Sequence, residues 1–323
     1  MARKKKKNAK AGKLLSFLLI TAALISIAIT INERYLHLDY IPSWNTIFTK
    51  IGLIADTKIV IGDNVSVHFI DVGQGDSRLI KSSNYSILID TGEDRYAATL
   101  INYLKSQEVK QLDYVILTHP HSDHIGGFLK IADEFKIQNL LMSRIPDEKV
   151  PTTASFTRVL DGIEKHSINA GYVYPGQKIE LENSVIDIIG PLDNNYSNLN
   201  NYSVVLKFSH GDNSFLFTGD MEKESEDDIY ETNANLNAKV LDVAHHGSRS
   251  SSQKSILNAV GGKFAVISSG SYNTYNHPTE QTLQRLLDTG YKIYRTDTHG
   301  NIVFISDGVD LEIIIKDFGE LAA

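Results

Sequence analysis

The chain has 323 residues, of which 42% are hydrophobic and 22% are charged, so it is long enough for one large globular domain plus an extension. It contains no cysteine, which excludes disulfide bonds and thiolate ligands and leaves nitrogen and oxygen donors for any bound metal. The 32 basic and 39 acidic residues give a net charge of −7, and without the seven basic residues of the first 13 the remainder carries about −14. A domain with this negative charge has no general electrostatic attraction for polyanions.

The N-terminus has the pattern of a membrane anchor. Residues 1–13 carry seven positive charges and no acidic residue, and residues 14–31 are 18 uncharged, mostly apolar residues. This length can span a membrane, and the basic flank should stay in the cytoplasm. We therefore predict a basic cytoplasmic segment at 1–13 and a single-pass transmembrane signal-anchor at 14–31, with everything after residue 32 outside the cell membrane. A cleaved signal peptide is the alternative, although Ile29-Thr30-Ile31-Asn32 lacks the small-x-small pattern of a cleavage site.

Residues 32–63 are predicted to be a spacer. Its aromatic residues, such as Tyr40 and Trp44, either rest at the membrane interface or belong to an irregular connector with a short helix near Asn45 to Ile54. From residue 64 the pattern changes to short apolar runs separated by glycine and Asn-Ser turns. We assign residues 64–323 to one domain.

Within this domain, strands and helices alternate. Mixed strands interleaved with helices suit an α+β fold with four layers, an αββα sandwich. Strands are predicted at 65–71, 77–81, 85–90, 112–117, 177–181, 184–189, 203–209, 214–218 and 238–244, with a hairpin at His210-Gly211-Asp212-Asn213. Helices are predicted at 96–107, 122–136, 154–166 and 222–232, and the final third continues the alternation.

The chemistry gathers in Thr118-His119-Pro120-His121-Ser122-Asp123-His124-Ile125-Gly126-Gly127, directly after the apolar strand. A tight turn at a strand end places short side chains in one small volume, and Ser122 is expected to be the N-cap of the next helix. Imidazole and carboxylate are ligand types for Zn²⁺ and Mn²⁺. His119 and His121 can reach one metal ion, while Asp123 and His124 can reach a second. Gly126 and Gly127 leave room for a neighbouring element.

His-x-His-x-Asp-His after a hydrophobic strand resembles the signature of the metallo-β-lactamase superfamily, and the resemblance covers about residues 65 to 316. Four further stretches resemble one subgroup, the stand-alone hydrolases related to the C-terminal domain of the ComEC/Rec2 competence proteins. These stretches are Val67-His68-Phe69-Ile70-Asp71-Val72-Gly73-Gln74-Gly75-Asp76-Ser77, Leu88-Ile89-Asp90-Thr91-Gly92, Phe217-Thr218-Gly219-Asp220 and Val243-Ala244-His245-His246-Gly247-Ser248.

The resemblance implies the αββα fold and a hydrolase that uses two divalent metal ions, Zn²⁺ or Mn²⁺. Asp220 would bridge the two metals, although an aspartate at a strand end also suits a turn or cap. His246 would be the last ligand of the second metal, and His245 would lie beside the substrate as an acid or hydrogen-bond donor; two surface histidines are the alternative. Asp123 and His245 are the predicted catalytic residues. A hydroxide between the metals would attack phosphorus or a carbonyl, because metal binding lowers the pKa of water.

The chain departs from the superfamily at the first metal, where many members have a further histidine before the bridging aspartate. Here Asn200-Asn201-Tyr202-Ser203 contains none, and Asn201 or Ser203 is the candidate weak ligand. More oxygen donors would favour Mn²⁺ over Zn²⁺.

Further candidates come from the glycine-rich turn and a later motif. Asp71, Gln74 and Asp76 are expected near the metals or as parts of a purely structural turn, and Asp90 is placed similarly. His277 is expected either to contact substrate or to have a capping or packing role.

Three functions remain open at the level of sequence. The first is a membrane-anchored extracellular phosphodiesterase or nuclease of the ComEC-like type, with nucleic acid as substrate. The second is an enzyme acting on cell-wall phosphoesters such as teichoic acid, and the third is a binding module with a degenerate metal site. The intact His-x-His-x-Asp-His argues against the third, and the subgroup motifs argue against a lactamase. The sequence indicates no protein partner.

Overall fold

The computed structural model describes residues 2–32, 64–193, 195–271 and 273–315. The chain divides into two compact units, Met1–Lys58 and Ile59–Ala323. The predicted spacer, with its short helix near residues 45–54, lies outside the described residues.

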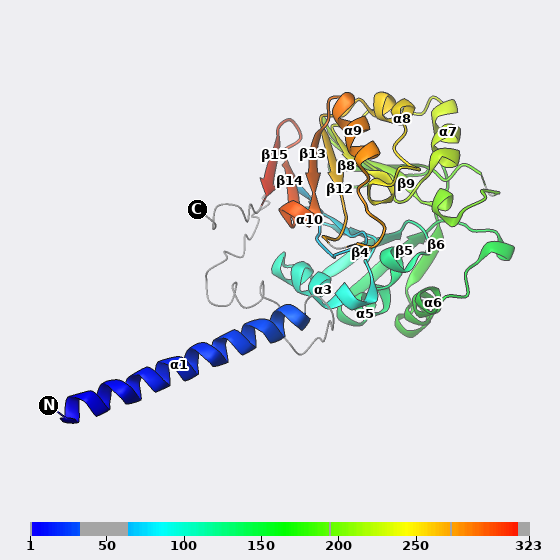
Figure 1. Ribbon diagram of the computed structural model, residues 1–323. Coiled ribbons are helices and arrows are strands. Elements are labelled where there is room, and N and C mark those ends of the chain that lie inside the picture. The colour runs from blue at the N-terminus through cyan, green and yellow to red at the C-terminus, as the bar shows by residue number, and fades with distance from the viewer. Residues whose placement is uncertain (1, 33–63, 194, 272, 316–323) are drawn as a thin grey trace. The chain divides into compact units, whose positions relative to one another are not determined.

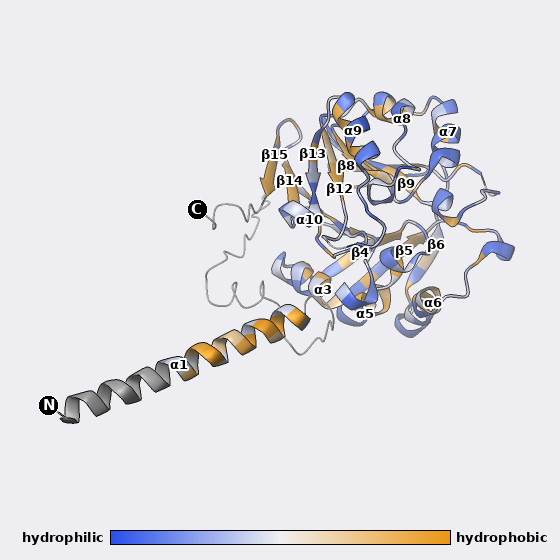
Figure 2. Ribbon diagram, in the orientation of Figure 1, coloured by the Kyte–Doolittle hydropathy of each residue, from blue (hydrophilic) through white to orange (hydrophobic). Residues whose placement is uncertain are grey.

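The described part of the first unit is one helix, α1 (Ala2–Ile31). Its apolar side chains are largely exposed, for example Phe17 at 66% and Leu24 at 62%, and Figure 2 shows this hydrophobic stretch in orange. Over the residues that the structure describes, no helix is long and apolar enough to cross a membrane. The transmembrane signal-anchor predicted at 14–31, and the single-pass location derived from it, are therefore not supported.

The second unit contains two sheets (Figure 1). In the first sheet, the neighbouring strands from β3 to β6 pair in parallel, and in the second sheet those from β10 to β13 pair in parallel. Within the described residues the first sheet has the order β15 (Leu311–Ile315), β14 (Ile302–Ser306), β1 (Val65–Phe69), β2 (Arg78–Lys81), β3 (Ser86–Ile89), β4 (Gln111–Leu117), β5 (Lys136–Met142) and β6 (Asn169–Tyr172). The second has the order β13 (Lys292–Arg295), β12 (Phe264–Ile267), β11 (Val240–Asp242), β10 (Asn213–Phe217), β9 (Val205–His210), β8 (Ser184–Gly190) and β7 (Lys178–Glu180).

Helices cover the outer face of each sheet, and Figure 2 shows hydrophilic residues in blue along them. The first sheet is covered by α3 (Ala97–Ser106), α4 (Ser122–Ile125), α5 (Phe128–Glu134) and α6 (Ala154–His166). The second is covered by α7 (Lys223–Glu231), α8 (Lys254–Val260) and α9 (Glu280–Asp288), and the short α10 (Thr296–His299) follows β13. The predicted four-layer αββα sandwich is confirmed.

Strand periodicity separates the apolar residues into layers. On β10, Phe215 and Phe217 point into the core between the sheets, while Leu216 packs under the helices of the second sheet. On β4, Ile116 faces the inter-sheet core and Val115 faces the opposite helix layer. Successive side chains of a strand point to opposite faces, so apolar residues on both faces require cover on both sides.

Three local predictions differ from the structure. The helix predicted at 122–136 is two helices, α4 and α5, interrupted at Gly126 and Gly127. A Cβ on Gly127 would lie 2.4 Å from the carbonyl oxygen of Thr91, so the predicted close approach to a neighbouring element is confirmed. The N-cap of α4 is His121, with extended φ and ψ, and not Ser122. The strands β5 and β6 were not predicted, because β6 is mostly exposed and has no apolar alternation.

Replacement of Phe304 tests the inter-sheet core. This residue is fully buried, and its ring lies 5.7 to 5.9 Å from those of Phe69, Phe215 and Phe264. Phe304→Ala should lower the free energy of unfolding by about 3–5 kcal/mol, measured by urea denaturation, because a cavity remains where the ring was. Tyr230→Ala on the exposed surface of α7 is the control and should change it by less than about 0.5 kcal/mol. Equal stability of both variants would contradict the layer assignment.

Candidate metal centre

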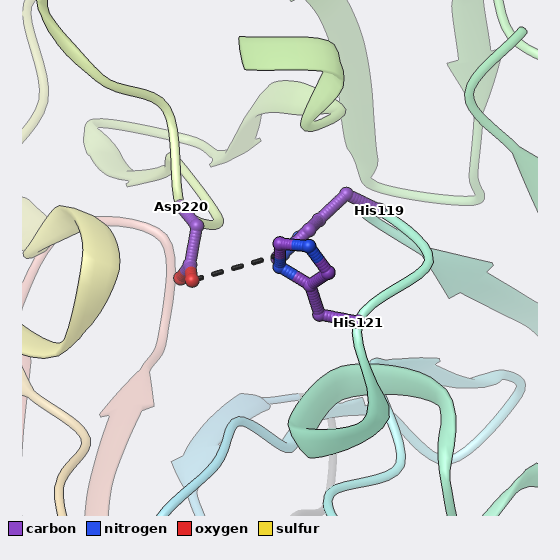
Figure 3. A group of neighbouring side chains, drawn as sticks. All are labelled: His119, His121 and Asp220. Carbon is purple, nitrogen blue, oxygen red and sulfur yellow. Dashed lines mark hydrogen bonds and ion pairs between the residues drawn. The ribbon is translucent and has the colours of Figure 1, made fainter. Parts of the chain in front are cut away.

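The loop after β4 places the predicted ligands at one end of the sandwich. His119 and His124 are buried, and His121 is half-buried. The Nε2 atom of His119 lies 3.0 Å from Nδ1 of His121 and 3.7 Å from Oδ2 of Asp220 (Figure 3). Asp220 follows β10 of the other sheet. One ligand atom from each of these side chains lies within 4.8 Å of the others, so His119, His121 and Asp220 could hold one metal ion.

A second group adjoins the first. Asp123, His124 and His246 also bring ligand atoms within 4.8 Å of one another. Nε2 of His246 lies 3.3 Å from Oδ2 of Asp123, and Nε2 of His124 lies 3.2 Å from Oδ1 of Asp220. Asp220 thus turns one oxygen toward His119 and the other toward His124. The structure brings all six predicted ligands together, with Asp220 between the two groups.

The chemistry of these donors fits divalent metal ions. Nε2 of His124, Nε2 of His246 and Oδ1 of Asp220 are buried and have no hydrogen-bond partner among the described residues. The Nδ1 atoms of the same two imidazoles are fixed by hydrogen bonds. Nδ1 of His124 is 2.9 Å from Asp90, and Nδ1 of His246 is 2.9 Å from the Ser268 carbonyl. Imidazoles that bind metals usually have the second nitrogen fixed in this way. The donor set is nitrogen and oxygen only.

The charges around the centre favour a cation. Burial lowers the pKa of His124, but the carboxylates of Asp220 and Asp90 bring it well above its ordinary value. Burial likewise lowers the pKa of His246, and Asp220 and Asp76 bring it well above. Burial raises the pKa of Asp220, but the charges of His124 and His246 hold it well below its usual range. The carboxylates therefore stabilise positive charge at this point, as they would that of a divalent ion.

A buried arginine lies behind the ligands. Arg78 on β2 is 1% exposed, with NH1 2.6 Å from Asp76 Oδ2 and NH2 2.7 Å from Asp242 Oδ2. Oδ1 of Asp76 lies in turn 3.4 Å from Nδ1 of His246. Burial raises the pKa of Asp76, but Arg78 and His246 lower it to about 2, so this carboxylate is charged at neutral pH. Sequence reasoning missed Arg78 and Asp242, which stand in two different strands and pair only in the folded protein.

Asp90 fixes the loop that carries the histidines. It is fully buried with φ of 59°, and its carboxylate accepts hydrogen bonds from the backbone N–H and the hydroxyl of Thr118, both at 2.8 Å. The same carboxylate contacts His124 at 2.9 Å. Asp90 was expected near the metals, and it lies behind a ligand and not among the ligands.

The two histidines after β11 adopt a rare backbone conformation. His245 and His246 have φ of 52° and 53°, the left-handed region that costs about 1–3 kcal/mol per residue and persists where surroundings fix it. His246 points to Asp123, whereas Nε2 of His245 lies 3.7 Å from Asp220 and its Nδ1 3.1 Å from Glu222. The side chain of His245 is 22% exposed. It therefore lies at the rim of the metal centre. From the sequence, His245 was predicted to lie beside the substrate, but its contact with Glu222 was not predicted.

The two candidates for the missing histidine have different positions. Asn201 faces away from the histidines: its Oδ1 accepts hydrogen bonds from the N–H groups of Glu222 and Ser225 at the start of α7. The structure does not support Asn201 as a weak ligand, because its side-chain oxygen caps that helix. Ser203 lies at the centre, with Oγ 3.3 Å from Nδ1 of His119 and accepting the N–H of Asp220 at 3.0 Å. It therefore links two residues of the first group.

The remaining candidates surround the centre. Oδ1 of Asp71 accepts the N–H of Gly73, so this carboxylate stabilises the glycine-rich turn. Gln74 accepts the N–H of Gly270 and joins that turn to the loop after β12. The ring of His277 lies 5.4 Å from that of His245, and burial lowers the pKa of His277 to about 4. Of these three residues, His277 is the one whose ring lies beside a residue at the rim of the metal centre, His245.

Arg78 can be tested through stability. Arg78→Met leaves Asp76 and Asp242 buried without their cation, so the free energy of unfolding should fall by about 3–5 kcal/mol. Urea denaturation in EDTA separates this loss from metal binding. The control is Arg95→Met, which breaks an exposed pair with Glu93 and should change stability by less than about 1 kcal/mol. A fully stable Arg78→Met variant would show that the buried charge is dispensable.

Metal binding should release protons. Because their pKa values are raised well above the ordinary value, His124 and His246 are protonated at pH 7 in the metal-free protein and must lose a proton to bind a metal. Affinity for Zn²⁺ or Mn²⁺ should therefore fall as the pH is lowered from about 8 to 6. Calorimetry in two buffers of different ionisation enthalpy measures the release. His166→Ala on α6 is the control and should behave as wild type, whereas binding without proton release would refute the ligand assignment.

Comparison with known proteins agrees with the fold. The metallo-beta-lactamase fold protein YhfI from Bacillus subtilis has a similar fold, with a TM-score of 0.50 at 14% identity, covering 76% of this chain and 100% of that protein. ComE operon protein 3 of Bacillus subtilis (strain 168) is 31% identical over 261 residues, 74% of this chain and 32% of the relative. Competence protein ComA of Neisseria gonorrhoeae is 32% identical over 238 residues, 72% of this chain and 31% of the relative.

The chain thus spans about a third of the length of the curated relatives it matches. The predicted similarity to the ComEC-like competence proteins is confirmed at this level. Residues 70–271 match the Metallo-beta-lactamase superfamily, and the chain belongs to that superfamily.

Proposed function

We propose that the chain is a metal-dependent phosphodiesterase acting on nucleic acid. The observation that carries the proposal is the position of Asp220, whose Oδ2 lies 3.7 Å from His119 of the first group and whose Oδ1 lies 3.2 Å from His124 of the second. Two divalent ions, when bound, supply a water of lowered pKa and positive charge for the oxygens of a phosphodiester. The donor groups fit such ions, and membership of the superfamily supports metal-dependent hydrolysis.

The protein's own residues supply orientation and a proton. Asp90 and the Ser268 carbonyl hold the rings of His124 and His246 so that both Nε2 atoms face Asp220. Glu222 holds the Nδ1 side of His245, which turns its Nε2 toward the same carboxylate. Burial lowers the pKa of His245, but Asp220 and Glu222 raise it above the ordinary value. A charged His245 at the rim can donate a hydrogen bond or a proton to a substrate oxygen.

Nucleic acid is proposed from the relatives. One is named a competence protein, and another, Recombination protein 2 of Haemophilus influenzae (strain ATCC 51907 / DSM 11121 / KW20 / Rd), is named for recombination and is 27% identical over 253 residues. A second candidate follows from charge: about −14 outside the first 13 residues would attract a cell-wall phosphoester with a cationic substituent. A substrate panel separates the two.

Removal of single ligands tests the proposal. Asp123→Ala and His124→Ala should each lower the cleavage rate of single-stranded DNA and bis-p-nitrophenyl phosphate by several orders of magnitude, because each removes a donor from the second group. Hydrolysis by the full chain is measured with Mn²⁺ or Zn²⁺, and circular dichroism checks the fold, which should survive because Asp123 and His124 belong to the short helix α4 and to none of the apolar core clusters. His166→Ala serves as the control.

Two results would contradict the proposed function. Unchanged diesterase activity in either variant would remove the metal groups from the reaction. Release of phosphate or alcohol from teichoic acid, with no cleavage of DNA, would favour the cell-wall phosphoester.

A further inference from the structure

A cavity of about 70 Å³ adjoins the metal centre on the side of His119. It lies where β4, β5 and β6 end, beside the first half of α6. His119 and Pro120 of the metal-binding loop form part of its wall, so the cavity and the first ligand group share His119. The full lining is Leu117, His119, Pro120, Ile125, Met142, Ser143, Ile145, Val150, Phe156, Val159, Leu160 and Tyr172.

The wall of this cavity is apolar. It contains no lysine, arginine, aspartate or glutamate, in a domain whose surface is otherwise rich in acidic residues. Three of its side chains are more than a third exposed: Tyr172 is 50% exposed, Leu160 49% and Val150 38%. Apolar surface gathered beside a hydrolytic site gains free energy when an apolar part of the substrate covers it. A cavity of this size has room for a group of several heavy atoms, since a single water needs about 10–15 Å³.

Besides His119, one polar side chain, Ser143, interrupts the apolar wall. Ser143 is 6% exposed, and its Oγ is buried with no hydrogen-bond partner among the described residues. A buried hydroxyl without a partner is unfavourable, and a ligand that offers a donor or acceptor there would satisfy it. The occupant should therefore be apolar on its faces and polar at one edge.

An aromatic side chain stands at the open edge. Tyr172 on β6 lies directly opposite Met142 on β5 in the sheet register, so both side chains lie on the same face. A tyrosine ring beside a methionine is a surface on which a flat ring can stack. A choline or D-alanine substituent is cationic and would be matched by carboxylates, and this wall has none.

We propose that this cavity is the subsite for a nucleobase of the substrate, whose phosphodiester lies at the metal centre. The proposal depends on the phosphodiesterase function and extends it to the base. The base would stack on Tyr172 and present its polar edge to Ser143. His119 belongs both to the cavity wall and to the first ligand group, so the base and the phosphate are positioned by adjoining surfaces.

Binding of the base can be measured without metal and without catalysis. The chain has three methionines, of which Met142 lines the cavity and Met221 is buried under the helices of the second sheet. Thymidine, which has no phosphate, is titrated into the full chain labelled with ¹³C at the methionine methyl groups, in EDTA. The Met142 signal should shift and saturate while the Met221 signal stays in place. An unmoved Met142 signal, or equal shifts of both, would overturn the subsite.

Use of the base during cleavage needs a second measurement. A thymidine dinucleotide is compared with the same diester carrying an abasic sugar. Tyr172→Ala should lower kcat/KM for the dinucleotide by about 10- to 100-fold, the usual effect of removing one stacking partner. The same variant should leave the abasic diester within about twofold, and Tyr172→Phe should retain the wild-type preference, because the ring remains. The matched control is Tyr174→Ala, an exposed tyrosine outside the cavity.

The two measurements separate the subsite from the proposed function. Equal cleavage of the dinucleotide and the abasic diester by the wild-type chain overturns the subsite and leaves the phosphodiesterase intact. Cleavage of neither diester, with a saturable shift of Met142, removes the proposed function and supports a base-binding cavity.

Discussion

The candidate site depends on one positive charge buried between the two sheets. Arg78 extends from the first sheet, and its partner Asp242 ends a strand of the second, at 2.7 Å. Removing an ion from water is expensive, so a buried guanidinium requires carboxylates at hydrogen-bond distance on more than one side. Asp76 supplies the second one at 2.6 Å. This requirement fixes how the ends of β2 and β11 meet, and the metal-binding loops begin close to both.

The carboxylates that hold the arginine also orient the metal ligands. Asp76 contacts Nδ1 of His246 at 3.4 Å, and Asp90, 3.7 Å from the arginine, contacts Nδ1 of His124. One network thus sets the direction in which both Nε2 atoms point. Asp90, His245 and His246 all have positive φ. Such strain persists only where surrounding bonds fix it, and here the fixed groups face the candidate metal centre.

The sequence predicts the parts of this arrangement that depend on strand ends. His119, His121, Asp123, His124, Asp220 and His246 all follow apolar strands, and strand ends of the two sheets meet at one edge. The sequence predicts poorly the direction in which a side chain points. Asn201 stands in the stretch where a further ligand was expected, yet its side-chain oxygen caps the start of α7. The arginine network could not be derived, because Arg78 and Asp242 are 164 residues apart in the sequence. β6 was not predicted, because its four residues are largely exposed and show no apolar alternation.

The first ligand group lacks the further histidine that many superfamily members have, and this lack determines its set of donor atoms. Ser203 occupies the space beside His119 and accepts the N–H of Asp220, so it joins two ligands without adding an imidazole. The group then has two imidazoles and one carboxylate, which is the number of protein donors typical of a catalytic metal that keeps a position for water or substrate. The apolar cavity lies against His119, on the side of this same group. With the proposed nucleic-acid substrate, an oxygen bound at the first group would place the neighbouring base beside that cavity, while Asp220 connects this group to the second one.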